Sequence, residues 1–342
     1  MYLNTYHLKD SFVLESGEQL QELAISYHTS APAYNGKKVL WICHALTANS
    51  DPTEWWEVMV GTGKCFDPEM YFIVCANIVG SCYGTTGPMS INHATGSPWY
   101  DTFPEVSVRD LVAAHDLLRR FLGIEKIDMV IGASMGGFQA LEFVLCYPQV
   151  CTYLVLIACN ARVSPYSTAY NESQRMAILA DQTYQEYRQG GGEKGLAAAR
   201  SIALLSYRSY DGYWISQSES DMDTFMAKRA ATYQQYQGEK LKRRFNAYSY
   251  MALTKTFDTH NVGRGRGGVE KALQSICAKT LCIGIIGDQL FPPKEVEYMA
   301  QHIPHAHYAT LDSDFGHDGF LLEWEALKKI ITSFKHIDHA NS

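Results

Sequence analysis

The hydrophobic pattern of the chain predicts a parallel β-sheet that is covered by helices on both faces. Short runs of mostly apolar residues alternate with longer segments in which apolar residues recur every three or four positions. Strands that are buried on both faces form such continuous runs, and their alternation with helices is typical of α/β proteins. The predicted strands cover residues 37–43, 71–77, 126–132, 153–159 and 279–287, and residues 12–29 predict two more strands around a turn at 16–18.

Helices are predicted between these strands. Residues 108–122 have the apolar spacing of an amphipathic helix. Residues 135–147 follow a strand directly and end before Pro148, where the geometry of proline disfavours a continuing helix. A last helix is predicted at 321–334, so we expect an α/β fold with a mostly parallel central sheet flanked by helices.

The segment 164–268 interrupts this alternation. It contains no strand-like run, and glycine-rich breaks divide it into several predicted helices. It also holds 11 of the 22 tyrosines of the chain. These features predict a helical lid inserted into an α/β core, with the core formed by residues 1–163 and 269–342. The alternative is an ordinary helical subdomain without contact to the chemistry.

Composition and charge exclude some classes of protein. Hydrophobic residues make up 46% of the chain and charged residues 19%, which excludes disorder. A net charge of −7 argues against sequence-independent binding of nucleic acid, which requires a cationic face. The segment Gly263–Gly268, Gly-Arg-Gly-Arg-Gly-Gly, resembles an RNA-binding tract, but in an acidic protein we expect it to be a flexible connection.

The cellular location is expected to be cytoplasmic. No apolar run approaches the roughly 20 residues of a membrane-spanning helix. The first residues lack the basic and apolar regions of a signal peptide. The nine cysteines have no disulfide-framework spacing, and most lie inside apolar runs, as buried reduced thiols do.

A candidate nucleophile lies directly after the strand predicted at 126–132. The sequence Gly132-Ala133-Ser134-Met135-Gly136 is a Gly-x-Ser-x-Gly motif between a strand and a helix, the context that identifies the nucleophile elbow of the α/β-hydrolase fold. The small flanking residues permit the sharp turn that exposes the serine hydroxyl. Ser134 is therefore the predicted nucleophile, and the backbone N–H of Met135 is a predicted oxyanion donor.

A serine hydroxyl needs a base and an orienting carboxylate, which in this fold follow in the order acid, then histidine. Asp288 ends the strand at 279–287, and His317 lies in a glycine-flanked loop before the final helix. These two residues are the predicted acid and base. His44 follows another strand, in the loop where this fold places its second oxyanion donor, so we expect it to shape that loop. Three further histidines are expected at the surface: His302, His305 and His307.

A triad alone indicates acyl transfer and leaves water, an alcohol or an amine open as the acceptor. The amino-acid sequences of several segments narrow the choice of acceptor. The stretches HALTANS, NIVGSCYGTTGPMSIN, GASMGGFQALEF, GLAAARSIALLSYRS, DQLFPPKE and GHDGFL resemble those of the α/β-hydrolase-type homoserine O-acetyltransferases of methionine biosynthesis. The resemblance extends from about Leu14 to the final helix.

This resemblance implies ping-pong transfer from acetyl-CoA to L-homoserine, without a metal or prosthetic group, by a homodimer whose lids pack together. It assigns Ser134, Asp288 and His317 to the triad, and the N–H groups of Leu46 and Met135 to the oxyanion hole. The substrate carboxylate and amine are assigned to two further residues, Arg208 and Asp318. A zwitterionic amino acid requires one fixed cation and one fixed anion, and arginine offers a bidentate fork to a carboxylate.

Alternatives remain open on the same scaffold. The sequence diverges from the family pattern between Tyr210 and Ala231 and at Asn246–Tyr250, where the lid helps to define the pockets. Succinyl-CoA as the donor or L-serine as the acceptor would therefore fit. Two other functions remain possible. One is a carboxylesterase that uses water as the acceptor, and the other is a binding protein of the same fold without catalytic activity.

Overall fold

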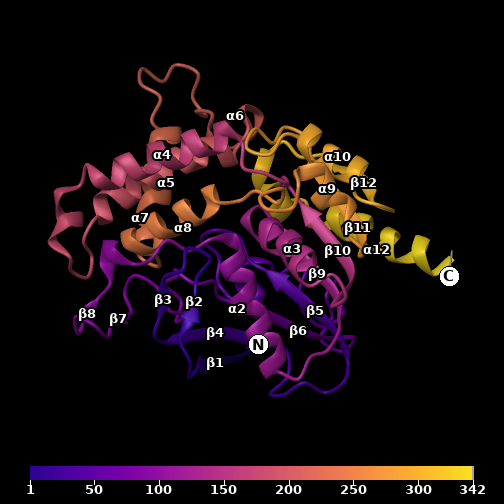
Figure 1. Cartoon of the computed structure of the whole chain (residues 1–342). Coiled ribbons are helices and arrows are strands. Elements are labelled where there is room, and N and C mark those ends of the chain that lie inside the picture. Colours follow the sequence, from indigo (N-terminus) through magenta and orange to yellow (C-terminus); the bar gives the residue numbers. More distant parts are fainter. Residues whose placement is uncertain (341–342) are drawn as a thin grey trace.

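The computed structural model describes residues 1–340, and its centre is an eight-stranded sheet (Figure 1). The strands, in their order across the sheet, are β1 (Tyr2–Leu8), β4 (Leu23–Thr29), β6 (Tyr71–Ala76), β5 (Lys38–Cys43), β9 (Ile127–Ala133), β10 (Cys151–Ile157), β11 (Lys279–Ile285) and β12 (His307–Leu311). In this sheet β4 pairs antiparallel with β1 and β6, and the other neighbours pair parallel. The mostly parallel sheet confirms the predicted α/β class.

Consecutive residues of β5 show why the central strands are apolar throughout. Val39 and Trp41 belong to the larger core cluster, which also contains side chains of the helices on one face. Leu40 and Ile42 point to the opposite face and join a second cluster with the final helix. All four side chains are buried. Both faces of the sheet are therefore covered, as the continuous apolar runs predict.

Helices flank the sheet on both sides and connect its parallel strands. The helices outside the segment 164–268 are α1 (Pro52–Trp55), α2 (Val108–Phe121), α3 (Met135–Cys146), α9 (Val269–Gln274), α10 (Pro293–His302), α11 (Gly319–Leu322) and α12 (Trp324–Ala340). Short 3₁₀ turns and hairpins complete this part: η1 (Tyr100–Thr102), η3 (Gly316–Asp318), β2 (Phe12–Val13) with β3 (Gln19–Leu20), and β7 (Ile91–Asn92) with β8 (Ser97–Pro98).

A group of helices lies between β10 and β11 in the chain and above one end of the sheet in space (Figure 1). It consists of α4 (Pro165–Leu179), η2 (Gln182–Glu186), α5 (Glu193–Tyr207), α6 (Tyr210–Gln217), α7 (Arg229–Lys242) and α8 (Ala247–Asp258). We call residues 165–258 the lid. The segment predicted at 164–268 thus begins one residue before α4. Of the range predicted as the second core part, 269–342, residues 341 and 342 lie outside the described residues.

Several elements differ from the prediction. Residues 12–29, predicted as two strands, contain three: β2, β3 and β4. The edge strand β1 was not predicted, because all seven of its residues are at least partly exposed and form no apolar run. The helix predicted at 321–334 is divided into α11 and α12, since the backbone of Glu323 turns away at φ −92° and ψ 47°. The hydroxyl of Ser313 donates a hydrogen bond of 3.1 Å to the Glu323 carboxylate at this break. Helical periodicity alone does not reveal such a break.

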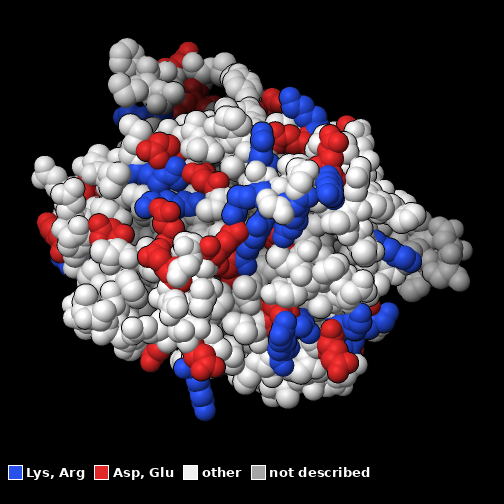
Figure 2. All heavy atoms as spheres, in the orientation of Figure 1, with Lys and Arg blue, Asp and Glu red and all other residues white. Residues whose placement is uncertain are grey.

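The segment Gly263–Gly268 corrects another expectation. Arg264 binds the carboxylate of Glu15 at 2.8 and 2.9 Å, and Arg266 binds that of the buried Glu142 at 2.7 and 3.0 Å. These ion pairs hold the segment against the core, so it is not a loose connection. Figure 2 shows basic and acidic side chains interspersed over one face of the molecule, as such pairing requires.

Among the helices of residues 1–340, none combines the length and apolarity needed to cross a lipid bilayer.

Candidate active site

Ser134 lies in the turn between β9 and α3, with a backbone φ of 57° and ψ of −127°. A positive φ is uncommon for a residue other than glycine and persists only where the surroundings enforce it. The N–H of Ser134 donates to the carbonyl of Ile157 in β10 at 3.0 Å, and its own carbonyl accepts from the N–H of Gly137 at 2.9 Å. The turn is therefore fixed on both sides of the serine.

The glycines of the motif are required by close packing. A Cβ atom at Gly132 would lie 2.0 Å from the carbonyl oxygen of Gly136. One at Gly136 would lie 2.1 Å from the oxygen of Cys43 in β5, and one at Gly137 would lie 2.5 Å from the sulfur of Cys159. The helix α3 thus approaches the strands so closely that only glycine fits at these positions.

The carboxylate of Asp288 connects the loop after β11 to His317. Its Oδ1 accepts hydrogen bonds from the N–H groups of Leu290 and Phe291 at 2.8 and 2.9 Å. Its Oδ2 lies 2.7 Å from Nδ1 of His317. Both side chains are buried. Since Nδ1 faces the carboxylate, Nε2 is the nitrogen of His317 that is left for the cavity.

Burial and charge act in opposite directions on His317. Desolvation by itself lowers the pKa of the imidazole, because it disfavours the charged form. The negative charge and hydrogen bond of Asp288, assisted by the charge of Asp318, outweigh this effect, and the pKa of His317 is raised above its usual value. Three aromatic rings surround the imidazole, with centroids 5.7, 5.3 and 5.6 Å away: Tyr207, Phe291 and Phe320.

His44 is locked in the loop after β5 and is not available as a base. Its Nδ1 lies 2.8 Å from the carbonyl of Ala45, and its Nε2 accepts from the N–H of Ile78 at 3.3 Å. These partners assign a neutral ring with the proton on Nδ1. Burial lowers the pKa of His44 to about 4. Gln139 in α3 also donates to the His44 carbonyl at 3.0 Å, so this loop is held against α3.

The two predicted oxyanion donors, Leu46 and Met135, both lie near Ser134. Leu46 lines the same cavity as Ser134, and Met135 is the first residue of α3. Neither backbone N–H donates a hydrogen bond to a backbone acceptor among the described residues. The N–H of a first helical residue has no acceptor within its helix, and the helix end adds partial positive charge. Both groups therefore remain free to stabilise a developing negative charge.

Arg208 and Asp318 form an ion pair beside the histidine. Nε of Arg208 lies 2.7 Å from Oδ2 of Asp318, although the N–H is not aligned for a hydrogen bond. The guanidinium also lies over the ring of Phe315, with 5.7 Å to the centroid. The next residue, Ser209, donates from its hydroxyl to the carbonyl of Asp314 and so ties the end of α5 to the loop of His317.

Four of the predicted residues line one cavity of about 430 Å³, whereas Arg208 and Met135 do not line it and adjoin it through Asp318 and Ser134. Ser134, His317, Asp318 and Leu46 line it directly, while Asp288 lies behind His317. No hydrogen bond joins Ser134 to His317 in the part of the chain that the structure describes. Such bonds are often long in unliganded enzymes and tighten when substrate binds. With His317 as the base, Ser134 in this arrangement could attack the carbonyl carbon of an acyl group bound in the cavity.

Several residues of this cavity were not found from the sequence. Tyr207 and Arg200, both on α5, line it together with Lys240 and Arg244 at the end of α7. Arg200 and Tyr207 are seven residues apart, which is two helical turns, and the Arg200 guanidinium lies 5.4 Å from the centre of the Tyr207 ring. This seven-residue spacing places Arg200 and Tyr207 on the same face of one predicted helix, and it could have indicated from the sequence that they lie side by side.

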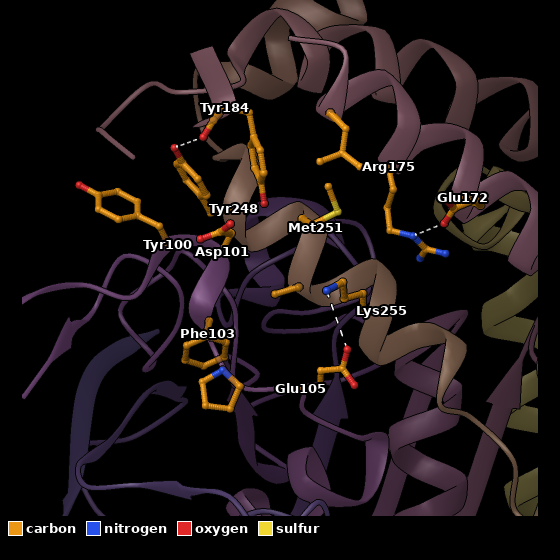
Figure 3. A pocket seen from close by; sticks show the side chains of 13 residues that line it. Tyr100, Asp101, Phe103, Glu105, Glu172, Arg175, Tyr184, Tyr248, Met251 and Lys255 are labelled. Atoms are coloured by element: carbon orange, nitrogen blue, oxygen red, sulfur yellow. Dashed lines mark hydrogen bonds and ion pairs between the residues drawn. The ribbon is translucent and has the colours of Figure 1, made fainter. Parts of the chain in front are cut away.

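A second cavity of about 300 Å³ lies under the lid, between η1, α4 and α8 (Figure 3). Its cations are paired with acids. Arg175 binds Glu172 and Asp258, each at 2.8 Å, and Lys255 lies 3.8 Å from Glu105. The predicted nucleophile, acid and base line no part of it. The candidate triad therefore lies outside this second cavity.

The remaining histidines give no metal site. Among the side chains that the structure describes, those of residues 1–335, no group of three or more His, Cys, Asp or Glu could hold a metal ion. His305 and His307 are exposed and His302 is half-buried, with its Nδ1 2.8 Å from the carbonyl of Tyr298.

Comparison with known proteins identifies relatives over nearly the whole length. Residues 38–323 match a family model described as the alpha/beta hydrolase fold. A homoserine O-acetyltransferase of Cyclobacterium marinum is 43% identical over 332 residues, which cover 96% of this chain and 94% of the relative.

Solved structures give the same picture of the fold. The crystal structure of a homoserine O-acetyltransferase from Staphylococcus aureus is 29% identical, with a TM-score of 0.81, and covers 98% of this chain and 94% of its own. The esterase E22 is 22% identical with a TM-score of 0.87, over 97% of this chain and 99% of its own. The likeness to the esterase speaks for the fold alone.

Proposed function

The chain belongs to the homoserine O-acetyltransferase family of the α/β-hydrolase fold, and on this premise we propose that it transfers an acetyl group from acetyl-CoA to the hydroxyl of L-homoserine. The products are O-acetyl-L-homoserine and CoA, a step of methionine biosynthesis. The observation that supports the proposal is that one member of each of two pairs, His317 and Asp318, lines the cavity of Ser134. One is the hydrogen-bonded pair of Asp288 and His317, and the other is the ion pair of Arg208 and Asp318.

In the first half of the reaction Ser134 attacks the thioester carbonyl of acetyl-CoA. Nε2 of His317 takes the hydroxyl proton, and Asp288 stabilises the imidazolium and holds its tautomer. The N–H groups of Leu46 and Met135 bind the oxyanion of the tetrahedral intermediate. When the intermediate collapses, the C–S bond breaks, His317 returns the proton to the sulfur, and CoA leaves as a thiol. The acetyl group stays on Ser134 as an ester.

In the second half L-homoserine is the nucleophile. His317 takes the proton of its side-chain hydroxyl, and the oxygen attacks the acetyl-Ser134 carbonyl. Collapse breaks the ester bond to Ser134, which recovers its proton from His317. Arg208 is proposed to bind the carboxylate of homoserine and Asp318 its amine, so that the hydroxyl is aimed at the ester. This acceptor site is what favours homoserine over water.

The proposed sequence of steps needs no metal or prosthetic group, because His317 makes every proton transfer and the two N–H groups bind the oxyanion. We also propose a cytoplasmic location. It is supported by nine free cysteines, five of them buried, since thiols of this kind are typical of reducing compartments.

We further propose that the protein is a homodimer that associates through the lid. The segment after α6 projects away from the rest of the molecule (Figure 1). Met222 and Phe225 in this segment are 95% and 100% exposed. Large apolar side chains exposed together mark an interaction surface, and a second copy is the occupant proposed here. The other large apolar residues exposed nearby are Tyr210, Trp214, Ile215 and Met226.

One assay tests the proposed reaction. Acetyl-CoA and succinyl-CoA are each offered with L-homoserine, L-serine or water as the acceptor, and CoA release and the acylated product are measured. The proposal predicts rapid O-acetylhomoserine formation from the first pair, with CoA release dependent on homoserine. Equal CoA release without an amino acid would identify an esterase, and faster use of succinyl-CoA or serine would change the substrate assignment.

A further inference from the structure

Three basic residues gather at the cavity of Ser134 without serving the proposed chemistry. Arg200 lies on α5, Lys240 in the last turn of α7, and Arg244 two residues beyond the end of α7. All three line the cavity of about 430 Å³ into which Ser134 and His317 face. They come together because α5 and α7 pack against each other above the carboxyl end of the sheet.

None of the three has an acidic partner. Within the described residues, no Asp or Glu oxygen lies within 4.0 Å of their side-chain nitrogens. The acids of the cavity are otherwise engaged, since Asp318 pairs with Arg208 and Glu54 accepts a hydrogen bond of 2.6 Å from Asn49. In the second cavity, by contrast, Arg175 and Lys255 both have acidic partners. In a chain with a net charge of −7, such a cluster indicates an anionic ligand.

The two arginines are positioned by neutral groups, which leaves their charge uncompensated. Nη1 of Arg244 donates to the hydroxyl of Tyr83 at 2.7 Å and to the carbonyl of Thr47. The guanidinium of Arg200 lies over the ring of Tyr207. Lys240 is exposed at the cavity and reaches solvent. Two guanidinium groups held in place beside an exposed ammonium group suit the recognition of phosphate groups.

We propose that Arg200, Lys240 and Arg244 bind the phosphate groups of the nucleotide portion of the acyl donor. This inference rests on the proposed function. With the acetyl group at Ser134, the pantetheine arm would lie in the cavity that these cations line. The three residues then contribute to donor affinity and select a phosphorylated thioester, while Arg208 and Asp318 serve the acceptor.

The test compares two donors that differ only beyond the pantetheine arm: acetyl-CoA and S-acetylpantetheine, which carries no phosphate. The variant is Arg200→Gln/Lys240→Gln, and the matched control is Arg243→Gln, an exposed arginine that does not line the cavity. Arg244 is kept, because it also contacts the loop of Leu46. For each protein, kcat/KM is measured with both donors at saturating homoserine.

The double variant is expected to lose about 10- to 100-fold in kcat/KM for acetyl-CoA, mostly through KM, as for lost hydrogen bonds to charged groups. The kcat/KM for acetyl-CoA divided by that for S-acetylpantetheine should therefore fall in the double variant. In the control variant this ratio should equal that of the unchanged protein. An equal loss with both donors, or no loss with acetyl-CoA, overturns the phosphate subsite. If the unchanged protein transfers nothing from either donor to homoserine, the proposed function itself fails, which is a distinct result.

Discussion

Arg208 and Asp318 are paired with each other before any substrate is present, with Nε of the arginine 2.7 Å from Oδ2 of the aspartate. Both side chains are mostly buried, so each charge is compensated inside the protein. In the proposed acceptor site, a zwitterionic amino acid would enter between them and replace one ion pair with two. The carboxylate takes the arginine and the ammonium takes the aspartate. Acceptor binding therefore leaves no buried charge without a partner.

The acceptor site predicts a selective effect of substitutions at this pair. Arg208→Ala should weaken homoserine capture by about 2–5 kcal/mol, the cost of removing one side of a desolvated charge pair. Asp318→Asn should have a smaller effect, because an amide oxygen still accepts a hydrogen bond from the ammonium. The measurement is the rate of Ser134 acetylation relative to the rate of homoserine-dependent deacylation in each variant. Equal slowing of both steps would indicate a purely structural pair.

The hydrogen bonds of Asp288 predict the outcome of Asp288→Asn. An asparagine keeps the oxygen that accepts from Leu290 and Phe291, so the loop and the fold should be retained. Its amide group would then face Nδ1 of His317 as a donor and force the wrong tautomer, which lowers turnover by roughly 10⁴-fold. Circular dichroism and steady-state kinetics on the same sample check both expectations. Near-normal turnover would remove Asp288 from the triad.

The raised pKa of His317 predicts the pH dependence. The base must be neutral to accept a proton, so the acetylation rate should rise with pH. The midpoint should lie above the usual histidine value of about 6.5, because Asp288 and Asp318 favour the imidazolium. Replacing Asp318 by asparagine should move the midpoint to lower pH, since one stabilising charge is lost. A stopped-flow profile with a midpoint below 6 would contradict this electrostatic account.

The sheet was predictable because its central strands are buried on both faces, and their apolar runs survive as local signals in the sequence. The edge strand β1 lacks such a run, and the order of strands depends on pairing between distant segments, such as β5 with β9. The break at Glu323 coincides with a hydrogen bond from the distant Ser313, which helical periodicity does not reveal. Local patterns therefore predicted elements, whereas tertiary contacts decided their limits.

The site residues likewise fall into those that local sequence patterns predict and those that only tertiary contacts bring together. Ser134, Asp288 and His317 each directly follow a strand or lie in a glycine-flanked loop, positions that can be recognised along the chain. Arg200 and Lys240 come from different helices of the lid and share a cavity only when these helices pack together. Their separate sequence contexts contain nothing that predicts this.

The proposed dimer predicts an effect of the exposed segment after α6. Met222→Ser/Phe225→Ser should raise the dimer dissociation constant at least about tenfold, because the loss of two apolar anchors from an interface is expected to cost about 1.4 kcal/mol or more in total. Met70→Ser, at another exposed apolar residue, is the control and should leave the constant unchanged. Sedimentation equilibrium measures all three proteins. Association through this segment would be contradicted if the unchanged protein were a monomer. It would also be contradicted if the double variant had the same dimer dissociation constant as the unchanged protein.

The central claim is that Ser134 carries the acetyl group between donor and acceptor. The most direct measurement is mass spectrometry of the protein after acetyl-CoA is added without homoserine, followed by a chase with homoserine. We expect one added acetyl group, about 42 Da, on the peptide of Ser134, its loss during the chase, and the appearance of O-acetylhomoserine. Ser134→Ala should show no label and at least about 10³-fold less turnover. Full labelling of that variant, or a label that homoserine does not discharge, would contradict the account.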